Sequence, residues 1–289
     1  MSSMYSGKEK LIDEYKYVFN KDLLKGKVAF ITGGGSGIGF TITEVLMRHG
    51  CDTVIASRRL DKLQDSASAL EAATGRKCLP VQMDVRDPKK VQAAVREAMT
   101  KFGKINILVN SAAGNFLCPA EGLSFNAFRT VMDIDTNGTF NTTKVVFDEY
   151  MKNNGGTIVN ITALLQVRGQ AYQLHAGCAK AAIETMTKHL AVEWGEKGIR
   201  VMCVAPGPIS DTEGFSRLGG KALSDEYVKN IPVQRLGTRE DIANTVLYVV
   251  SDAAQLLTGT TVIADGGSWL TSENNVRRSR KLIEMYSKL

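Results

Sequence analysis

The chain has 289 residues, of which 44% are hydrophobic and 23% charged, and its formal net charge is +6 at pH 7. This composition is typical of one α/β domain, while the lack of an apolar run of about 18 residues and the charges throughout residues 1–27 argue against a membrane span or a secretory signal. The basic residues form no stripe interleaved with aromatic side chains, which disfavours nucleic acid and favours a polyphosphorylated small molecule, although a basic surface that serves only solubility has the same charge.

Short apolar runs that indicate buried strands alternate with stretches of helical periodicity. Seven runs predict strands, at residues 28–31, 53–56, 79–81, 107–109, 157–159, 201–204 and 261–264. Apolar residues at helical spacing between them, such as Val91, Val95 and Ala98, predict helix faces turned to the core. Buried strands joined by helices form a parallel sheet. We therefore expect a single-domain, Rossmann-type, doubly wound α/β fold with about seven mostly parallel strands.

We place a dinucleotide-binding catalytic domain at residues 26–270, after an N-terminal extension at 1–25 and before a C-terminal tail at 271–289. The extension, the tail and a stretch near residues 208–231 lack clear periodicity, and the sequence has no internal repeat. Ligands of open α/β sheets bind beyond the carboxyl ends of the strands. The residues that end each predicted strand are therefore the first candidates for function.

A glycine cluster with the pattern T-G-x-x-x-G-x-G begins at Thr32, after the first predicted strand. Glycine permits positive φ and close approach of the backbone to a ligand. A helix that begins near Ile38 would direct its free N–H groups and the positive end of its dipole at a pyrophosphate. The cluster alone could be an ordinary tight turn, but its place between strand and helix predicts a dinucleotide site. Its members are Gly33, Gly34, Gly35, Ser36, Gly37 and Ile38.

The end of the second predicted strand indicates which dinucleotide binds. A carboxylate there would bind the 2′-hydroxyl of NAD, whereas this sequence has Arg58 and Arg59, with Lys62 following. Arginine can neutralise a 2′-phosphate, so we expect NADPH; two solvated surface arginines are the alternative. Asp84, after the third strand, is placed to accept a hydrogen bond from the adenine amine. Asn110, at the end of the fourth, is expected beside the cofactor.

The assembled motifs resemble the short-chain dehydrogenase/reductase family over about residues 26–270. The resemblance rests on the glycine cluster, on Asp84-Val85, on Lys180 opening a long helix, and on the motifs Asn110-Ser111-Ala112-Ala113-Gly114 and Pro206-Gly207-Pro208-Ile209. It implies a nicotinamide cofactor that Lys180 binds through the ribose hydroxyls. The further cofactor contacts that it implies are Pro206, Gly207, Pro208 and Ile209.

The sequence departs from that family at the catalytic positions. Its members normally carry Y-x-x-x-K, a serine thirteen residues before the tyrosine and an asparagine on an earlier helix. Here Ala176 stands four residues before Lys180, Ala163 stands thirteen before Ala176, and Asp135 replaces the asparagine. Alanine offers no proton and no hydrogen bond. A titratable group is thus lost at one position and gained at another.

The missing tyrosine argues against ketone reduction, in which it exchanges a proton with the carbonyl oxygen. A conjugated thioester needs a hydrogen-bonded oxyanion and an acid directed at carbon, because hydride adds to the far carbon and the charge delocalises into a dienolate. Asp135 could hold or relay that proton, directly or through water, while Lys180 contributes positive charge. The departure resembles the 2,4-dienoyl-CoA reductases, which use NADPH to form 3-enoyl-CoA during oxidation of unsaturated fatty acids. The resemblance to the peroxisomal type rests especially on Ala112-Ala113-Gly114-Asn115-Phe116, Ser124-Phe125-Asn126 and Asp133-Ile134-Asp135.

This resemblance also implies where an acyl-CoA substrate would bind. The residues expected along its acyl and pantetheine path are Phe116, Ser124, Phe125 and Asn126. Those available for the CoA phosphates are Arg58, Arg86 and Arg217; surface charges and core aromatics are the alternative interpretation. The chain ends in Ser287-Lys288-Leu289, which the peroxisomal import receptor reads at a C-terminus. We expect a peroxisomal enzyme, and by family habit a homo-oligomer, tetrameric or dimeric.

Other functions remain open at this point. A 2-enoyl-CoA or keto reductase could use Tyr172, His175 could serve as a substitute acid, and a non-catalytic NADPH-binding module could dispense with the tyrosine. The three histidines are far apart and the five cysteines form no C-x-x-C pair. We therefore expect neither a bound metal nor a disulfide framework.

Overall fold

The computed structural model describes residues 9–212, 215 and 228–271. Within these ranges seven strands form one sheet in the order β3-β2-β1-β4-β5-β6-β7, and every neighbouring pair is parallel. The strands are β1 (Val28–Thr32), β2 (Asp52–Ser57), β3 (Cys78–Gln82), β4 (Ile107–Asn110), β5 (Gly156–Ile161), β6 (Ile199–Pro206) and β7 (Thr261–Ala264). The predicted doubly wound fold is confirmed, and the strand order reverses between β1 and β4, where such sheets bind ligands.

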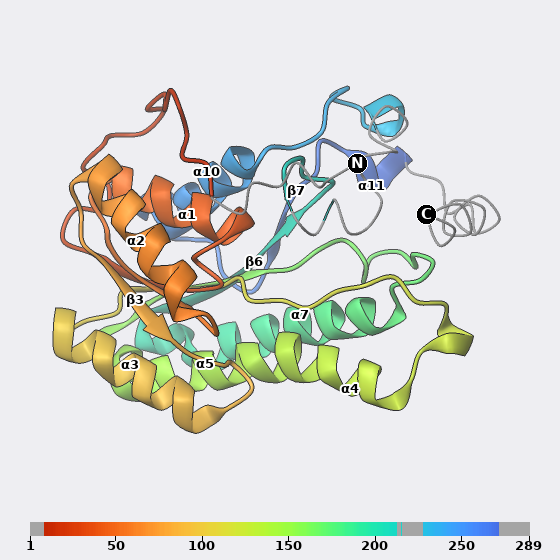
Figure 1. Ribbon diagram of the computed structural model, residues 1–289, viewed down its shortest axis with the longest axis horizontal. Helices are drawn as coiled ribbons and strands as arrows, with labels where there is room; N and C mark the ends of the chain where they lie inside the picture. Colours follow the sequence, from red (N-terminus) through yellow and green to blue (C-terminus); the bar gives the residue numbers. More distant parts are fainter. Residues whose placement is uncertain (1–8, 213–214, 216–227, 272–289) are drawn as a thin grey trace.

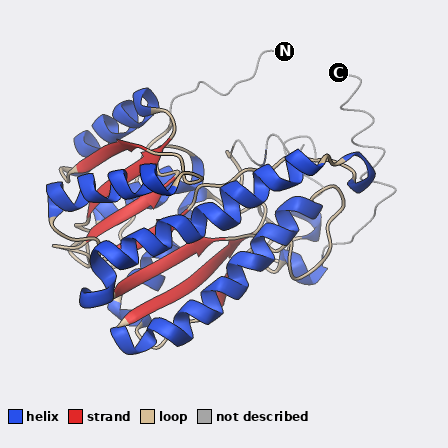
Figure 2. Ribbon diagram, turned by 90° about the horizontal axis from the view of Figure 1, so that it is seen from below, coloured by secondary structure: helices blue, strands red, loops and turns tan. Residues whose placement is uncertain are grey.

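Helices cover both faces of the sheet (Figures 1 and 2). They are α1 (Gly37–Arg48), α2 (Leu60–Thr74), α3 (Pro88–Phe102), α4 (Phe125–Met132), α5 (Gly138–Val146), α6 (Lys152–Asn154), α7 (Leu174–Trp194), α10 (Arg239–Val250) and α11 (Ser268–Thr271). Two π-helical turns, η2 (Asp133–Asn137) and η3 (Phe147–Met151), lie before and after α5, and short 3₁₀ turns are η1 (Ala120–Gly122), η4 (Gly195–Lys197) and η6 (Asp252–Ala254).

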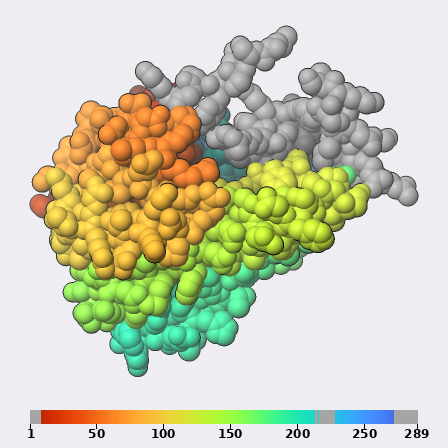
Figure 3. Space-filling model, turned by 60° about the horizontal axis from the view of Figure 1, so that its bottom comes forward, coloured from red at the N-terminus to blue at the C-terminus, as the bar shows by residue number. Residues whose placement is uncertain are grey.

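The core consists of an apolar layer on each side of the sheet, because successive side chains of a strand point to opposite faces. Ala29 and Ile31 of β1 pack with α1 and α10, whereas Phe30 between them packs with α3 and α7 on the other face. Figure 3 shows the molecule from the side of α3, α4 and α7, coloured from yellow to teal. Because all strands are parallel, their carboxyl ends, which carry the candidate site residues, lie along the same side of the sheet.

The N-terminal extension is part of the packed structure from residue 9 onward. Residues 9–25 contain no helix or strand and lie across α1 and α10. The apolar side chains that they pack against this layer are Ile12, Tyr15, Phe19, Leu23 and the fully buried Leu24. No helix among the described residues is long and apolar enough to cross a membrane.

The start of helix α7 differs from the sequence-based expectation. Lys180 does not open this helix, which begins six residues earlier, at Leu174. Lys180 therefore lies in the second turn, and Ala176 lies one turn before it on the same helix, as its spacing predicts. Both residues are buried, with exposed fractions of 7% and 2%.

Candidate active site

The predicted glycine loop lies between β1 and the first turn of α1. Gly33 and Gly37 have positive φ angles of 68° and 54°, a backbone region that favours glycine. A Cβ atom on Gly39 would lie 2.4 Å from the carbonyl oxygen of Gly33, so only glycine lets α1 approach the loop this closely. A Cβ atom on Gly37 would meet open space, and the first turn of the helix therefore borders an accessible region.

Thr32 connects this loop to the segment that follows β4. Its Oγ1 accepts hydrogen bonds from the backbone N–H groups of Ser111 and Ala112, both at 3.0 Å. The motif after the fourth strand is therefore fixed against the motif after the first. These two motifs therefore lie side by side at the switch point of the sheet.

The charged residues expected near the adenosine end lie at the ends of β2 and β3. Arg58, Arg59 and Lys62 are exposed. Asp84 is half-buried and binds Arg86: the Arg86 Nη2 nitrogen lies 2.6 Å from Asp84 Oδ2, and Nε lies 3.0 Å from Oδ1. This hydrogen bonding lowers the pKa of Asp84 below its usual value. Arg86 is thus already paired, which limits its availability for a CoA phosphate.

The side chain of Asn110 lies in the core at the end of β4. Its Nδ2 donates to Thr143 Oγ1 at 3.0 Å and to Asn160 Oδ1 at 2.8 Å, and Asn160 in turn donates to Thr187 of α7. Its amide nitrogen is therefore used within the protein. Its Oδ1 is buried and has no hydrogen-bond partner among the described residues. The expected position of Asn110 beside a cofactor stays a prediction.

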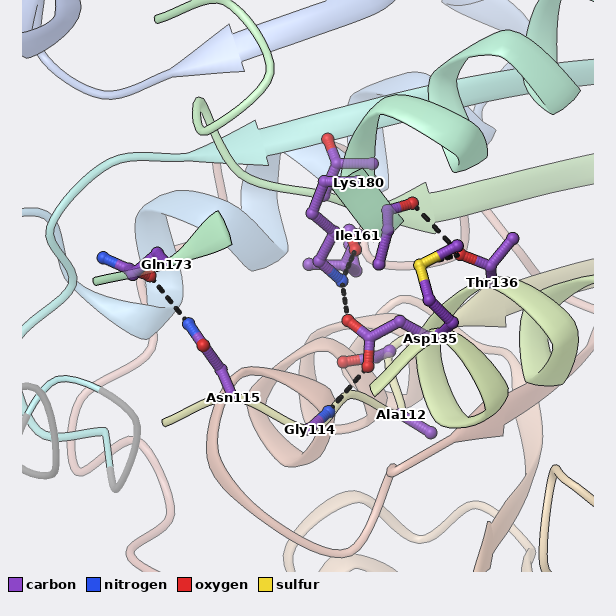
Figure 4. Close-up of polar contacts among 12 residues, drawn as sticks. Ala112, Gly114, Asn115, Asp135, Thr136, Ile161, Gln173 and Lys180 are labelled. Carbon is purple, nitrogen blue, oxygen red and sulfur yellow. Dashed lines mark hydrogen bonds and ion pairs between the residues drawn. The ribbon is translucent and has the colours of Figure 1, made fainter. Parts of the chain in front are cut away.

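Asp135 and Lys180 form an ion pair at the centre of the candidate site (Figure 4). Asp135 Oδ2 lies 2.9 Å from Lys180 Nζ, and the side chains are 1% and 9% exposed. The other carboxylate oxygen accepts from the Gly114 backbone N–H at 2.7 Å. Lys180 also donates to the carbonyl oxygen of Ile161, at 3.3 Å. The pair therefore joins η2, α7, β5 and the loop after β4.

Two features of the chain place Asp135 opposite Lys180. Asp135 lies in the π-helical turn η2, a wide turn of a kind often found at functional sites. The neighbouring Thr136 donates from Oγ1 to the carbonyl oxygen of Ala179 at 3.3 Å, which ties η2 to α7. This second contact fixes the two segments side by side. Gly114 and Ile161 complete the site through backbone atoms, for which side-chain patterns give no signal.

The positions of the missing hydroxyl groups are filled by small side chains. Ala176 is buried in α7, and Ala163 is half-buried in the loop after β5. The adjacent Thr162 is buried and points its Oγ1 at the carbonyl oxygen of Val204, 3.4 Å away. Neither alanine can exchange a proton. Asp135 and Lys180 form the ion pair at this place, and the buried His175 directly precedes Ala176.

The aromatic residues expected on the substrate side are both exposed at the surface. Phe116 is 37% exposed and stacks on the His175 ring, with centroids 4.2 Å apart and planes at 27°. His175 is buried, and burial lowers its pKa. Phe125, at the start of α4, is 93% exposed, and Asn126 is also exposed. Ser124 accepts from the Ala127 N–H and caps this helix.

Tyr172, the rival proton donor, does not lie on the helix of Lys180. It occupies the turn before α7 with a positive φ of 67°, and its carbonyl oxygen accepts from the Cys118 N–H at 3.0 Å. The segment beside it is fixed by a hydrogen bond of 2.8 Å from Asn115 Nδ2 to Gln173 Oε1 (Figure 4). Tyr172 therefore does not reproduce the one-turn spacing of the family tyrosine and lysine.

The remaining expected residues divide between the described and undescribed parts of the chain. Pro206 ends β6, and the loop after it is fixed to β7 by a hydrogen bond from the Gly207 N–H to Ala264. Pro208 is half-buried and Ile209 is buried. Arg217 and the terminal Ser287-Lys288-Leu289 lie outside the described residues. The described residues include no group of three or more His, Cys, Asp or Glu side chains able to hold a metal ion.

These residues fit a dinucleotide at the switch point. Gly39 lets α1 pack closely on the loop, and a Cβ atom on Gly37 would meet no atom within 4 Å, which suits a pyrophosphate site at the start of a helix. Exposed arginines follow β2 at the same ends of the strands. The residues at the end of β2 are Ser57, Arg58 and Arg59, none of which has a carboxylate that could bind a ribose hydroxyl. Lys180 lies on α7, and its expected binding of ribose hydroxyls stays a prediction.

Comparisons with known proteins give a consistent picture. A family model described as enoyl-(acyl carrier protein) reductase matches residues 33–268. The peroxisomal 2,4-dienoyl-CoA reductase [(3E)-enoyl-CoA-producing] of Danio rerio is 58% identical over 93% of this chain and 90% of that protein. The protein of that name from Rattus norvegicus is 57% identical over 92% of each chain. The crystal structure of a short chain dehydrogenase from Bacillus anthracis superposes with a TM-score of 0.80, at 39% identity over 86% of this chain and 99% of the other.

Proposed function

The chain belongs to the short-chain dehydrogenase/reductase family, and from that premise we propose that it reduces 2,4-dienoyl-CoA to 3-enoyl-CoA with NADPH in the peroxisome. The family uses nicotinamide dinucleotides, and the relatives from fish and rat carry the name of this activity and of this organelle. The observation that carries the proposal is the buried Asp135–Lys180 pair beside Ala176. The family tyrosine is absent here because Ala176 takes its place, whereas the family lysine is kept as Lys180 and gains a carboxylate partner in Asp135.

NADPH is favoured over NADH by the charges at the end of β2. The exposed Arg58 and Arg59, with Lys62 in the first turn of α2, can neutralise a 2′-phosphate. Asp84 can still accept a hydrogen bond from the adenine amine, since each carboxylate oxygen has two lone pairs. When bound, the dinucleotide supplies the hydride. The protein must supply a stabilised thioester oxygen and a proton at carbon.

We assign those two tasks to the buried pair. The ammonium group of Lys180 is held by Asp135 and by Ile161, so its positive charge is fixed near the reacting atoms, where it favours an oxyanion. Asp135 is held by Gly114 and Lys180 with little freedom to turn. In this position it assists delivery of a proton to carbon, directly or through a water molecule that it orients.

The acyl-CoA substrate approaches from the side of Phe116 and α4. Phe116 offers an aromatic face, while Phe125 and the polar residues Ser124 and Asn126 stand at the exposed start of α4. These side chains suit an apolar chain followed by the amide groups of pantetheine. Arg58 and Arg86, with Arg217 outside the described residues, are the proposed partners of the CoA phosphates. The Asp84–Arg86 pair makes Arg86 the weaker of the two described candidates.

The remaining proposals concern partners and location. Ser287-Lys288-Leu289 is proposed as the sequence that the import receptor reads. A homo-oligomer, tetramer or dimer, is proposed on family habit. The two rival functions, a 2-enoyl-CoA or keto reductase that uses Tyr172 and a non-catalytic NADPH-binding module, have weaker support. Tyr172 lies off the helix of Lys180, and a module without activity has no need of a buried carboxylate at Asp135.

A substrate comparison tests the proposal. The protein is incubated with NADPH and, in separate reactions, 2,4-hexadienoyl-CoA, 2-hexenoyl-CoA or a ketone, and NADPH oxidation is followed by absorbance. We expect oxidation with the dienoyl thioester and little with the other two. Rapid turnover of 2-hexenoyl-CoA or the ketone without turnover of the dienoyl thioester would contradict the proposal. NADPH binding with no turnover of any acyl-CoA would support the binding module.

A further inference from the structure

The segment of residues 9–25, here called the N-terminal strap, is fastened to α1 and α10 by buried polar contacts as well as apolar ones. The Ile12 N–H donates to the two carboxylate oxygens of Glu44, at 3.1 and 3.2 Å. The Tyr15 hydroxyl lies 2.9 Å from His49 Nε2 and donates to Asn244 Oδ1 at 3.2 Å. Glu44 and His49 are fully buried on α1 and at its end. The strap is therefore specifically docked along the length of α1.

At its start, the strap reaches the glycine loop. Glu9 Oε1 accepts a hydrogen bond from the Gly37 backbone N–H at 3.1 Å, and Glu9 Oε2 lies 2.6 Å from Arg239 Nη1. The side chains of Glu9 and Arg239 are only 10% and 16% exposed. One carboxylate thus joins three segments that are distant in sequence: the strap, the first turn of α1 and the first turn of α10.

Glu9 caps the start of α1, whereas Ser36, the residue directly before the helix, does not. Ser36 precedes the helix in an extended conformation, where a serine side chain commonly accepts from the first turn, yet it makes no capping hydrogen bond. The amide of Gly37 is one of the first N–H groups of the helix, which lack partners within the helix itself. A residue of the strap therefore caps the helix whose start forms the glycine loop.

The charge of Glu9 is balanced at this position. A carboxylate near the start of α1 would by itself oppose the phosphates of a dinucleotide, which seek the same positive helix end. The guanidinium group of Arg239 is in direct contact with it, so the pair adds no net charge. What the pair contributes is restraint, because Glu9 is anchored by Arg239 and accepts from the N–H group of Gly37, whose φ is 54°. Ordering a binding loop in advance lowers the entropic cost of binding.

We propose that Glu9 is a positioning residue of the dinucleotide site: acting through Gly37 and held by Arg239, it fixes the glycine loop and thereby raises the affinity for NADPH. The inference rests on the proposed function, in that it takes NADPH as the ligand of this loop. It gives the N-terminal strap a role in cofactor binding. Because Glu9 is directed at the loop and not at the Asp135–Lys180 pair, it leaves the chemical step unchanged.

Direct binding of NADPH tests this role. Wild type, Glu9→Ala, Glu9→Gln and the control Glu14→Ala are titrated with NADPH by fluorescence, and kcat and the KM for NADPH are measured in parallel. Glu14 is exposed on the same strap. We expect Glu9→Ala to raise the dissociation constant and the KM roughly three- to tenfold, with kcat within about twofold. Glu9→Gln keeps an oxygen for Gly37 and should show a smaller rise, while Glu14→Ala matches wild type.

Two further measurements separate positioning from general stability. In the free protein, hydrogen exchange at Gly37 should be faster in Glu9→Ala than in wild type and unchanged in Glu14→Ala. Arg239→Gln should weaken NADPH binding as well, and the double variant should bind no more weakly than Glu9→Ala, since both changes disrupt one contact. Arg239→Gln also serves as the test if Glu9→Ala fails to fold.

NADPH binding by Glu9→Ala that is as tight as in wild type, or tighter, would overturn the inference. So would additive effects of the two substitutions. These results are distinguishable from failure of the proposed function, because in that case wild type itself would not bind NADPH or would not turn over 2,4-hexadienoyl-CoA.

Discussion

Asp135 Oδ2 and Lys180 Nζ lie 2.9 Å apart, and their side chains are only 1% and 9% exposed. Burying two charges is costly, and apolar side chains of similar size often replace such a pair without loss of stability. The two apolar layers of this fold provide a large core without it. We therefore interpret the pair as serving chemistry, which is consistent with the frequent placement of buried ionisable groups at functional sites.

Loss of the Asp135 carboxylate is expected to slow turnover strongly. Asp135→Asn keeps an oxygen that can accept from Gly114 but cannot hold or relay a proton. We expect kcat with 2,4-hexadienoyl-CoA to fall about 10²- to 10⁴-fold, the usual contribution of a positioned acid or base. The matched control is Asp133→Asn in the same π-helical turn, where the carboxylate instead accepts from Asn137. A kcat for Asp135→Asn close to that of the control would refute the assignment.

Arg58 is expected to determine the preference for NADPH. Arg58→Ala removes a contact to the 2′-phosphate, and hydrogen bonds to charged groups contribute about 1.5–3 kcal/mol. The ratio of kcat/KM for NADPH to that for NADH should therefore fall roughly ten- to hundredfold, mainly through the KM for NADPH. Steady-state kinetics with both cofactors measure this ratio. Arg96→Ala, which changes an exposed arginine on α3, is the control. An unchanged ratio in Arg58→Ala would mean that other residues bind the phosphate.

The hydroxyl group of Tyr172 is expected to be dispensable. Tyr172→Phe keeps the aromatic ring and the backbone turn at the start of α7 and removes only the hydroxyl. We expect kcat with 2,4-hexadienoyl-CoA to stay within about twofold of wild type, because the proton is assigned to the Asp135 side of the site. Abolished turnover in this variant, together with retained turnover in Asp135→Asn, would reverse the assignment in favour of the tyrosine.

His175 is expected to make stability depend on pH. Burial lowers the pKa of the folded imidazole, whereas in the unfolded chain it protonates near pH 6.5. Between those two pKa values the unfolded state binds more protons than the folded state. The contribution of neutral His175 to the free energy of unfolding is therefore complete above about pH 6.5 and is lost as the pH falls toward the folded pKa. His175→Phe removes this group and keeps an aromatic ring for Phe116.

Thermal unfolding at about pH 7.5 and pH 5 measures this contribution. The fall in Tm between the two should be smaller in His175→Phe than in wild type, and a remaining fall is expected because burial also lowers the pKa of His49. His189→Phe, which changes an exposed histidine of the same helix, should show the wild-type fall. An identical fall in all three proteins would contradict the prediction.

The arrangement of the sheet is predictable from the sequence because its strands are buried on both faces. Such strands appear as continuous apolar runs, and these runs match the seven observed strands to within two residues at each end. The spacing of Ala176 and Lys180 likewise places them one turn apart. The start of α7 was less predictable, because no capping residue marks it. Gln173, the residue before the helix, makes no side-chain capping hydrogen bond.

Other parts of the site depend on contacts that no local pattern encodes. The π-helical turn that holds Asp135 has no side-chain signature, and its partners Gly114 and Ile161 contribute backbone atoms. The docking of the strap is even harder to predict from the sequence, because Glu9 binds Arg239, which is 230 residues away along the chain. Its docking depends on the assembled surface of α1 and α10, not on periodicity within residues 9–25.

The site of proton delivery tests the central claim, that Asp135 and Lys180 direct the proton to carbon 2 of the acyl chain. The protein converts 2,4-hexadienoyl-CoA with NADPH in D₂O, and NMR and mass spectrometry locate the deuterium and the remaining double bond. We predict 3-hexenoyl-CoA with one solvent deuterium at carbon 2. Formation of 2-hexenoyl-CoA with deuterium at carbon 4 would contradict the account, because the proton would then have been delivered to the other end of the dienolate.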